Sequence, residues 1–324
     1  MSKKKKSDSQ AAAYTGKVYD FCSKKKMILV IAICVIVALL AGALIRGVKF
    51  AIEFKGGTML TYSYTGDLDI DAVDAEVEKL GDSNVNVRRG ESLDSDGYQI
   101  TISFTSNEGL NADGQHELTE NLRAAFPDNE LELFDSNDVS PSSGREFLLK
   151  CLLAMVFAAV IIIIYIAIRF SRIGGWSAGI CSIFALCHDI LVALAVSIIC
   201  GFEFNSNIVA VILTILGYSI NNTIVIYDRI RENRNLMPKA SLNELINVSC
   251  TQSLTRSIRT SITTIGTMLV ITIVVLATGY KSLLSFSVPL MMGLISGTFS
   301  SLFVAPVTWS WWKNKSDAKK KSSK

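Results

Sequence analysis

The residues of this chain that could do chemistry are polar side chains inside long apolar segments. His188 and Asp189 follow each other near the middle of one segment, and Asn221 and Asn222 lie in the next. Arg256 precedes a Ser/Thr-rich stretch at the start of a further segment. A charge at the centre of a bilayer costs about 3 kcal/mol, so ionisable residues in spans usually face a bundle interior and mark ion or proton pathways. These residues are the candidate site.

Each of these residues also has a purely structural interpretation. Asp189 and His188 could form a satisfied pair that only helps helices to pack. Asn221 and Asn222 could hydrogen-bond to a neighbouring helix, a contact worth about 0.6 kcal/mol. Arg256 could extend its cationic head to the inner membrane surface. Residue type favours function for Asp189, leaves the asparagines open, and on its own favours the structural interpretation for Arg256.

The sequence lacks the residue patterns of enzymes and of cofactor sites. It contains no Walker A loop and no HExxH, and it has only 2 histidines. Its 7 cysteines form no CxxC pair and no cluster with zinc spacing, so neither a metal nor another cofactor is expected. Without a nucleotide site, energy for work would come from an ion gradient, which suits ionisable groups buried in a bundle.

Six apolar segments are long enough to cross a bilayer, which takes about 20 helical residues. Half of the residues are apolar and the mean hydropathy is +0.38, as in integral membrane proteins. The segments are Met27–Ile45, Phe147–Phe170, Ser177–Cys200, Ile208–Tyr227, Ile262–Thr278 and Leu283–Trp312. In the last one Gly293, Gly297 and Ser301 recur every four residues, which predicts close helix packing.

Charge is divided unevenly along the chain. Residues 47–146 contain 21 Asp/Glu and 7 Lys/Arg, whereas the remainder contains 8 Asp/Glu and 25 Lys/Arg. Basic residues favour the cytoplasmic side of a membrane. Both tails, the turn after the second segment and a long basic loop predicted at 228–259 are therefore expected inside. The links 201–207 and 279–282 hold few positive charges and are expected outside.

This topology predicts the domain organisation. A signal peptide also begins with basic residues, but here the apolar segment is longer than a usual signal core, which favours an uncleaved first span. The parts are a basic cytoplasmic tail (1–26), transmembrane helix 1 (27–46), an acidic extracytoplasmic domain (47–146), transmembrane helices 2–6 (147–312) and a second basic tail (313–324).

The acidic domain alternates strand and helix periodicity. The order βαββαβ predicts a small ferredoxin-like α+β sandwich inserted into a mainly α, six-helix transmembrane bundle. Strands are expected at Met59–Tyr64, Asn84–Arg88, Tyr98–Phe104 and Glu130–Phe134, and helices at Ile70–Leu80 and Ala112–Phe126.

From about residue 24 to residue 312 the chain resembles the SecF family, the smaller half of the SecD–SecF accessory complex of bacterial protein secretion. The motifs that carry the resemblance are Phe54-Lys55-Gly56-Gly57-Thr58, Val139-Ser140-Pro141, Tyr165 with Arg169-Phe170, Ala185-Leu186-Cys187-His188-Asp189, Gly217-Tyr218-Ser219-Ile220-Asn221-Asn222-Thr223-Ile224-Val225, Tyr227-Asp228-Arg229-Ile230-Arg231-Glu232-Asn233, and Asn247-Val248-Ser249 through Arg256 to Thr260-Ser261.

The resemblance implies a resistance-nodulation-division type of fold, in which this chain is half of a twelve-helix pseudo-symmetric unit. It implies SecD and the SecYEG channel as partners, with YajC-like and YidC-like membrane proteins as further candidates, and a translocating preprotein as the substrate in a bacterial plasma membrane. No nucleic acid is expected. The complex would use the ion-motive force to promote late steps of translocation, and the chain would not be an enzyme.

The sequence departs from the family pattern at Asn222, where relatives usually have an aspartate that acts with an arginine at the position of Arg256. Asparagine cannot carry a proton. Either a carboxylate of SecD is the sole ion carrier and Arg256 tunes it, or the amide oxygen of Asn222 helps to coordinate sodium; we favour the first. The Gly56-Gly57 turn is interpreted as scaffold at the entry to the first strand, because glycine permits backbone angles closed to other residues.

Two other functions compete with the translocase interpretation. One is a half-transporter of the same fold that exports lipids or small hydrophobic molecules, which would call for a larger outer domain with an apolar groove. The other is an assembly factor that stabilises the channel without ion flux, against which the buried Asp189 argues.

Overall fold

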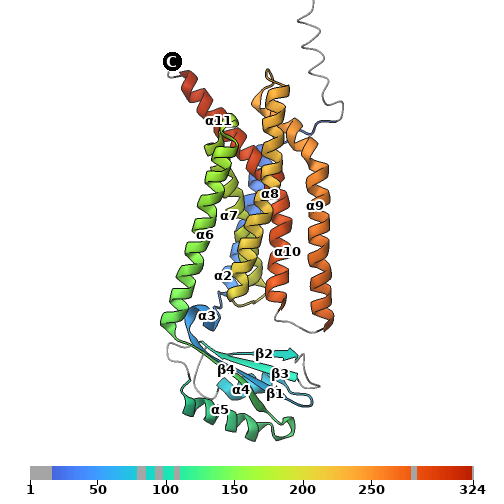
Figure 1. Cartoon of the computed structure of the whole chain (residues 1–324). Coiled ribbons are helices and arrows are strands. Elements are labelled where there is room, and N and C mark those ends of the chain that lie inside the picture. The colour runs from blue at the N-terminus through green and yellow to red at the C-terminus, as the bar shows by residue number, and fades with distance from the viewer. Residues whose placement is uncertain (1–16, 79–84, 92–97, 106–109, 279–282, 323–324) are drawn as a thin grey trace, which may run out of the picture.

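The computed structural model of the chain describes residues 17–78, 85–91, 98–105, 110–278 and 283–322. It has two parts, a bundle of long helices and a small α+β domain at one end of it (Figure 1). We call the end of the bundle next to this domain the domain end. The opposite end, where the C-terminal helix projects, is the tail end (Figure 1).

Six helices of the bundle are long and apolar enough to cross a membrane, which confirms the six-span fold class and a multi-pass membrane protein. The expected link 279–282 lies outside the described residues. The spans are α2 (Lys25–Arg46), α6 (Pro141–Arg169), α7 (Gly175–Ile199), α8 (Ser206–Leu236), α9 (Leu242–Thr278) and Leu284–Asp317, the last made of α10 (Leu284–Phe299), a π-helix η4 (Ser300–Val304) and most of α11 (Ala305–Ser322).

The prediction of a long loop at 228–259 is wrong. Both flanking helices continue into it, and only a short connection at 237–241 separates α8 from α9. The ion pair of Arg229 with Glu232, three residues apart, supports the extended end of α8. Arg229 also donates a hydrogen bond to Gln252 of α9. Polar composition therefore marked where the apolar span ends, and not where the helix ends.

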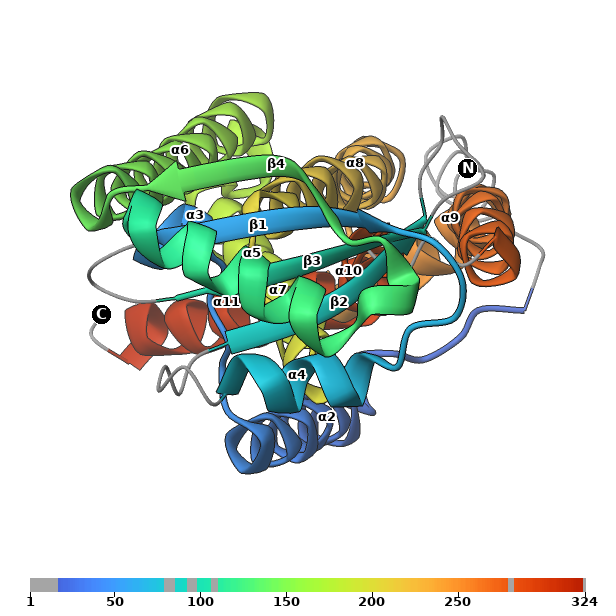
Figure 2. The same ribbon diagram turned by 90° about the horizontal axis from the view of Figure 1, so that it is seen from below.

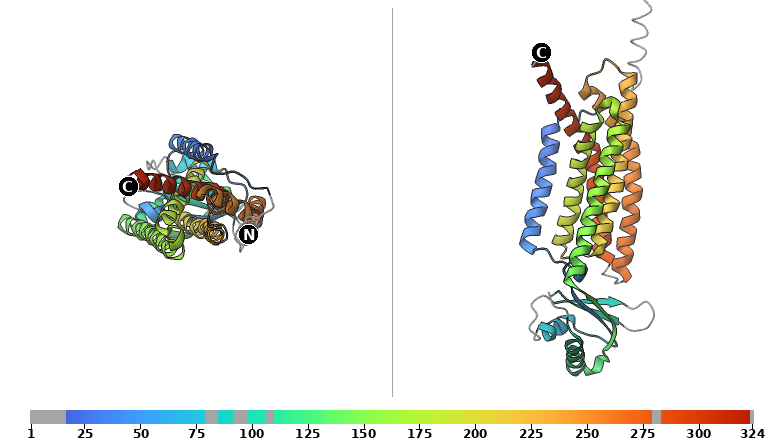
Figure 3. Two further views of the ribbon diagram at one scale, coloured as in Figure 1. Left: turned by 90° about the horizontal axis from the view of Figure 1, so that it is seen from above. Right: turned by 60° about the vertical axis from the view of Figure 1, so that its left-hand side comes forward.

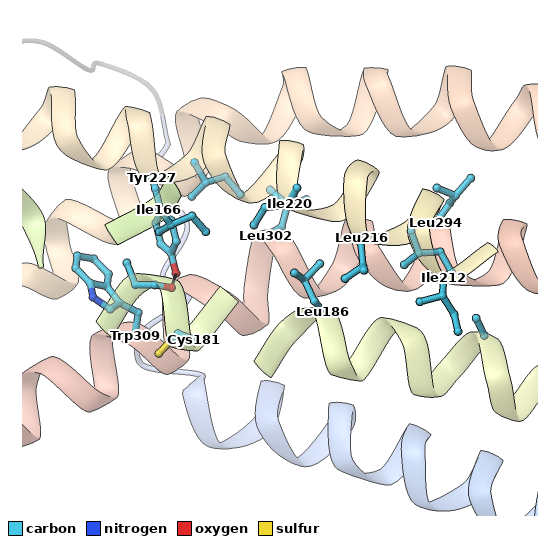
Figure 4. Close-up of a cluster of buried hydrophobic side chains, with 14 of the residues drawn as sticks. Ile166, Cys181, Leu186, Ile212, Leu216, Ile220, Tyr227, Leu294, Leu302 and Trp309 are labelled. Carbon is cyan, nitrogen blue, oxygen red and sulfur yellow. Dashed lines mark hydrogen bonds between the residues drawn. The ribbon is translucent and has the colours of Figure 1, made fainter. Parts of the chain in front are cut away.

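Three helices form the centre of the bundle. In the most apolar stretch of each span, 56% of α7, 50% of α8 and 61% of the α10–α11 span are buried, against 17% of α2, 17% of α6 and 22% of α9. The apolar core between the central helices includes Leu186 of α7, Leu216 of α8 and Leu294 of α10 (Figure 4). The three peripheral helices leave most of their surface to lipid or to partner proteins.

The acidic domain is a four-stranded antiparallel sheet with two helices on one face. The sheet order β2-β3-β1-β4 interleaves two βαβ units, which confirms the expected βαββαβ arrangement. The helices cover the sheet face that points away from the bundle (Figure 2). Its elements are β1 (Gly57–Tyr64), α4 (Ile70–Glu78), β2 (Val85–Glu91), β3 (Tyr98–Phe104), α5 (Ala112–Ala125), a 3₁₀ turn η1 (Pro127–Asn129) and β4 (Glu132–Val139).

Alternation along the strands builds the core of this domain. Leu60, Tyr62 and Tyr64 of β1 and Ile100 of β3 point to the helices and are almost fully buried, while the intervening residues face the bundle. Val73 of α4 meets them from the helix layer. The sheet face toward the bundle is therefore polar and free to contact it.

The chain enters and leaves the acidic domain at one place. The short helix α3 (Ile52–Lys55) packs against the start of α6, where the Phe54 and Phe147 rings stack at 5.5 Å. The backbones of Gly56 and Pro141 pass so close that a Cβ on Gly56 would lie 2.7 Å from the Pro141 Cα atom. The entering connection is joined to the α7–α8 turn, because Ala51 donates a backbone hydrogen bond to Phe204 and Phe204 donates one to Lys49.

At the tail end, the segment 17–24 that precedes α2 is hydrogen-bonded to α9. The side-chain oxygen Oδ1 of Asn247 on α9 accepts hydrogen bonds from the backbone N–H groups of Phe21 and Cys22. The Asn247 amide also donates to Asp20. Hydrogen bonds from Ser23 and Asn247 lower the pKa of Asp20.

Candidate intramembrane site

Asp189 lies in the middle of α7, and its side chain is completely buried between α7, α8 and α10. Small residues on α10 make this close packing possible. A Cβ on Gly297 would lie 3.2 Å from Ser219 Cβ and 3.5 Å from Asp189 Oδ2. A Cβ on Gly293 would collide with Ile215 at 2.2 Å. The glycine spacing that predicts close packing therefore brings polar side chains of α8 and α10 onto the carboxylate.

Three serine hydroxyls donate to the two oxygens of Asp189, and His188 lies beside them. Ser219 Oγ from α8 and Ser300 Oγ from η4 donate to Oδ2 at 2.7 and 2.6 Å. Ser296 Oγ from α10 donates to Oδ1 at 2.7 Å, and His188 Nδ1 lies 3.2 Å from the same oxygen. We call Asp189, Ser219, Ser296 and Ser300 the carboxylate cage.

A π-helix positions the last member of the cage. The backbone N–H of Ala305 donates to the carbonyl oxygen of Ser300, five residues back, so the helix widens by one residue at η4. Such single wide turns inside α-helices are frequently found at functional sites. Ser296 and Ser300 are one turn apart and grip opposite oxygens of one carboxylate.

His188 extends the polar cluster into the apolar core. Its Nδ1 atom lies 3.2 Å from Ser296 Oγ as well as from Asp189, whereas its buried Nε2 atom has no hydrogen-bond partner among the described residues. The ring lies 6.4 Å from that of Phe299. No lysine or arginine of the described chain forms an ion pair with Asp189, so its polar contacts are the three serine hydroxyls and His188.

Asn222 lies one helical turn beyond Ser219, on the interior face of α8. Its side chain is 3% exposed, and its Nδ2 atom has no hydrogen-bond partner in the described chain. Asn221 and Gly217 lie on the other side of the helix and are exposed. The expected pair of asparagines is thus divided between the interior of the bundle and its outer surface.

Arg256 is exposed on α9 and forms no ion pair with any residue that the structure describes. Its depth follows from the contacts around it. Gln252 accepts from Arg229, and Ser261 accepts from Tyr218, so Arg256 lies at about the level of Asn222. The bundle therefore does not bring Arg256 to Asp189, because one faces outward and the other is enclosed.

The remaining motif residues have identifiable structural contacts. Asp228 Oδ1 pairs with Arg169 of α6 at 3.0 Å and with Arg231 at 2.8 Å, and it thereby joins α6 to α8 at the tail end. Tyr218 and Thr298 both donate to Ser261, a contact that joins α8, α10 and α9.

Gly56 and Gly57 lie at the other end of the bundle, where the chain enters β1. They have φ angles of 90° and 135°, as the interpretation of a glycine turn requires. Among the described residues, no group of three or more His, Cys, Asp and Glu side chains gathers to hold a metal ion.

Sequence reasoning missed the three serines of the cage. Ser219 stood inside a motif dominated by the asparagines, and Ser296 and Ser300 stood beside the glycine stripe. A signal was present, because Ser296 and Ser300 are four residues apart and so share one helix face. The π-helix that aligns Ser300 with the carboxylate has no such signature.

Comparison with known proteins places these features in a family. The family description "Protein export membrane protein SecD/SecF, C-terminal" matches residues 118–315. Protein translocase subunit SecF of Rickettsia typhi is 33% identical over 291 residues, covering 89% of this chain and 90% of that one. SecF of Helicobacter pylori strain 26695 is 31% identical, covering 85% of this chain and 82% of the relative.

Solved structures agree with the sequence relatives. The crystal structure of SecDF from Thermus thermophilus, described as a translocon-associated membrane protein, aligns with a TM-score of 0.75 and 26% identity over 92% of this chain. A SecDF structure in a super-membrane-facing form aligns with a TM-score of 0.65 and 25% identity over 96% of this chain. This chain spans 39% and 41% of those two chains, respectively.

Proposed function

Because this chain belongs to the SecF family of protein translocase subunits, we propose that it acts with SecD to use an ion gradient for late steps of preprotein translocation. The half-transporter alternative is not favoured, since the relatives that match over most of their length are translocase subunits. An accessory role without catalysis fits a chain whose polar side chains gather inside spans.

The observation that carries the proposal is the outward-facing polar surface of α8 and α9. Arg256 is exposed at membrane depth without an ionic partner in the described chain, and Asn221 is exposed on the neighbouring helix. A charge exposed to lipid is costly, so this face is expected to meet another protein. A carboxylate of SecD that pairs with Arg256 would remove the cost and could carry the coupling ion.

The proposed topology puts the tail end in the cytoplasm and the acidic domain outside. Arg169, Arg229 and Arg231 lie at the tail end, as do the lysines at the start of α2 and in α11. The positive-inside rule then orients the bundle. In this orientation the acidic domain is available to a preprotein that leaves the SecYEG channel, with YajC-like and YidC-like proteins as further neighbours.

The test is gradient-driven translocation in vesicles that contain this chain, SecD and the channel. Arg256→Ala is expected to reduce translocation to the level seen without a gradient, and Arg256→Lys to retain part of it because the positive charge remains. Lys150→Ala is the matched control, because Lys150 is an exposed cation at the domain end that pairs with Glu146 of its own helix. Normal gradient-driven translocation by Arg256→Ala would sink the proposal.

Asn222→Asp tests the second hypothesis, in which the amide oxygen of Asn222 coordinates sodium. A carboxylate there would bind either ion differently from an amide. If Asn222→Asp leaves the preference between protons and sodium unchanged, this position has no special role in ion selection.

A further inference from the structure

We propose that Asp189 and the three serines of the carboxylate cage form a proton-binding site within this chain, and that protonation loosens α10 from α7 and α8. The inference rests on the proposed function, since it gives the proton of that function a second binding group. It differs from a cycle carried by SecD alone, because here the titrating atom belongs to this subunit.

Asp189 is the sole carboxylate in the six apolar segments of the sequence. Asn222, one turn beyond the cage, cannot take up a proton. If this subunit binds a proton within the membrane on a carboxylate, Asp189 must be the acceptor. Its complete burial and its place on a central helix mean that such binding would act on helix packing and not on the surface.

The charged groups of the surrounding helices do not compete for this carboxylate. From α7 itself, His188 is the titratable group that contacts Asp189, and α8, α10 and η4 contribute only uncharged hydroxyls. Cationic side chains on the other helices make contacts away from Asp189. Arg46 of α2 donates to the Ile199 carbonyl, and Lys313 of α11 donates to the Ile173 carbonyl. Arg169 of α6 pairs with Asp228, and Arg256 of α9 is exposed.

Proton binding changes the hydrogen-bond count of the cage in a definite way. The carboxylate accepts all three hydroxyl protons, and each of these bonds crosses between helices. A proton added to one oxygen makes that oxygen a donor, so one serine must turn its own proton away. The remaining hydrogen bonds then join neutral groups. Neutral hydrogen bonds are roughly half as strong as those to an ionised carboxylate. No other bond forms or breaks, and the proton leaves by the reverse step.

The π-helix connects this change to the end of the molecule. Ser300 is the first residue of η4, where α10 gives way to α11, and α11 projects beyond the bundle at the tail end (Figure 3). The Ser300 hydroxyl that bonds to Asp189 thus belongs to the irregular turn that joins the two helices. Release of Ser300 from Asp189 would therefore alter the joint between α10 and α11.

The first test detects the proton directly by infrared spectroscopy of the purified full-length chain in lipid vesicles. As the pH is lowered, the wild type is expected to gain a carboxylic acid band that is shielded from rapid hydrogen–deuterium exchange. Asp189→Asn should lack this band and Asp189→Glu should shift it. Asp113→Asn, at an exposed position of α5, should leave it unchanged. A band that survives in Asp189→Asn would overturn the proposal.

The second test asks whether the cage transmits proton binding to the helices. At one fixed pH, Asp189→Asn mimics the neutral carboxyl and is expected to speed backbone hydrogen exchange of α10 and η4 at least about fivefold. Ser300→Ala should speed exchange similarly but keep the infrared band. Ser182→Ala is the control, because Ser182 is buried on α7, donates to the Ala178 carbonyl and is not a member of the cage. Equal exchange in Asp189→Asn and wild type would refute the coupling.

Sodium is the alternative occupant that the same experiment separates. Replacing NaCl by choline chloride at constant pH should not change the acid band. If sodium removes the band at constant pH, the site binds sodium and the proton assignment is wrong. Neither readout requires SecD or secretion, so failure of the cage leaves the Arg256 test of the proposed function intact.

Discussion

Arg88 of the acidic domain and Glu203 of the α7–α8 turn form an ion pair with an N–O distance of 3.0 Å. The Asn86 amide donates to the same carboxylate. Both donors lie on β2, and Glu203 lies four residues beyond the end of the helix that carries Asp189. The pair therefore joins the α7–α8 turn to the sheet of the acidic domain.

Breaking this pair should loosen the acidic domain from the bundle. Glu203 is only 9% exposed, so Arg88→Ala leaves a largely buried carboxylate short of a partner. We expect the free energy needed to undock the domain to fall by about 1 kcal/mol, so that the undocked population rises roughly fivefold. The measurement is the rate of trypsin cleavage in the exposed connection at Lys49 and Lys55, which should rise.

The control for this prediction is Arg123→Ala, whose ion pair with Glu120 is half exposed and lies within α5. The double exchange Arg88→Glu with Glu203→Arg should restore protection. Equal cleavage rates in Arg88→Ala and wild type would show that the pair does not hold the domain.

Gly57→Ala should unfold or displace the first strand of the acidic domain. A Cβ there would lie 1.9 Å from the Phe104 carbonyl oxygen, and the φ angle of 135° is one that other residues rarely adopt. We expect a loss of at least about 2 kcal/mol in the stability of the domain, measured by chemical denaturation of the full chain in detergent. The helices of the bundle should be unaffected.

Gly66→Ala is the matched control for backbone strain without collision. Its φ angle is 77°, but the nearest atom to an added Cβ is 3.6 Å away. We expect a loss of only about 1 kcal/mol. A loss as large as that of Gly57→Ala would mean that strain alone, and not the close approach to Phe104, sets the requirement for glycine.

Tyr62 should make the acidic domain sensitive to alkaline pH. Burial raises the pKa of its hydroxyl, which is hydrogen-bonded to Thr119 at 3.0 Å. The unfolded chain then ionises at about pH 10 while the folded chain does not, so stability is full below pH 10 and falls above it. The loss can reach about 1.4 kcal/mol per pH unit for one group.

Tyr62→Phe should flatten this decline, at a cost of about 1 kcal/mol at neutral pH for the lost hydrogen bond. The measurement is denaturation of the acidic domain, within the full chain, between pH 8 and pH 11. Tyr98→Phe, whose ring is 45% exposed, is the control and should leave the decline unchanged. An identical alkaline decline in Tyr62→Phe would contradict the assignment.

The spans and the order of elements in the acidic domain could be predicted because each depends on local patterns. Long apolar runs specify membrane helices, and the alternation in Tyr98–Phe104 predicted β3 at its observed bounds. Hydropathy could not find the helical ends at 228–236 and 242–259, since Arg229 and Glu232 are polar but favour helix.

The candidate site was only partly readable for a different reason. Asp189 stands out in any apolar run, whereas Ser296 and Ser300 acquire their role only when α10 packs against α7. Asn222 and Arg256 were selected as members of one site, yet the bundle places one inside and leaves the other on its surface. Their separation depends on how α8 and α9 pack, which the residue types do not reveal.

The exposed face of α8 and α9 also has a consequence for the life of the protein in the cell. A copy made without its partner would hold Arg256 and Asn221 against lipid tails. Membrane quality-control proteases and chaperones could recognise such unassembled subunits by these polar groups. The same residues that we assign to the interface would then keep the two subunits in equal numbers, because any surplus copy would remain exposed to degradation.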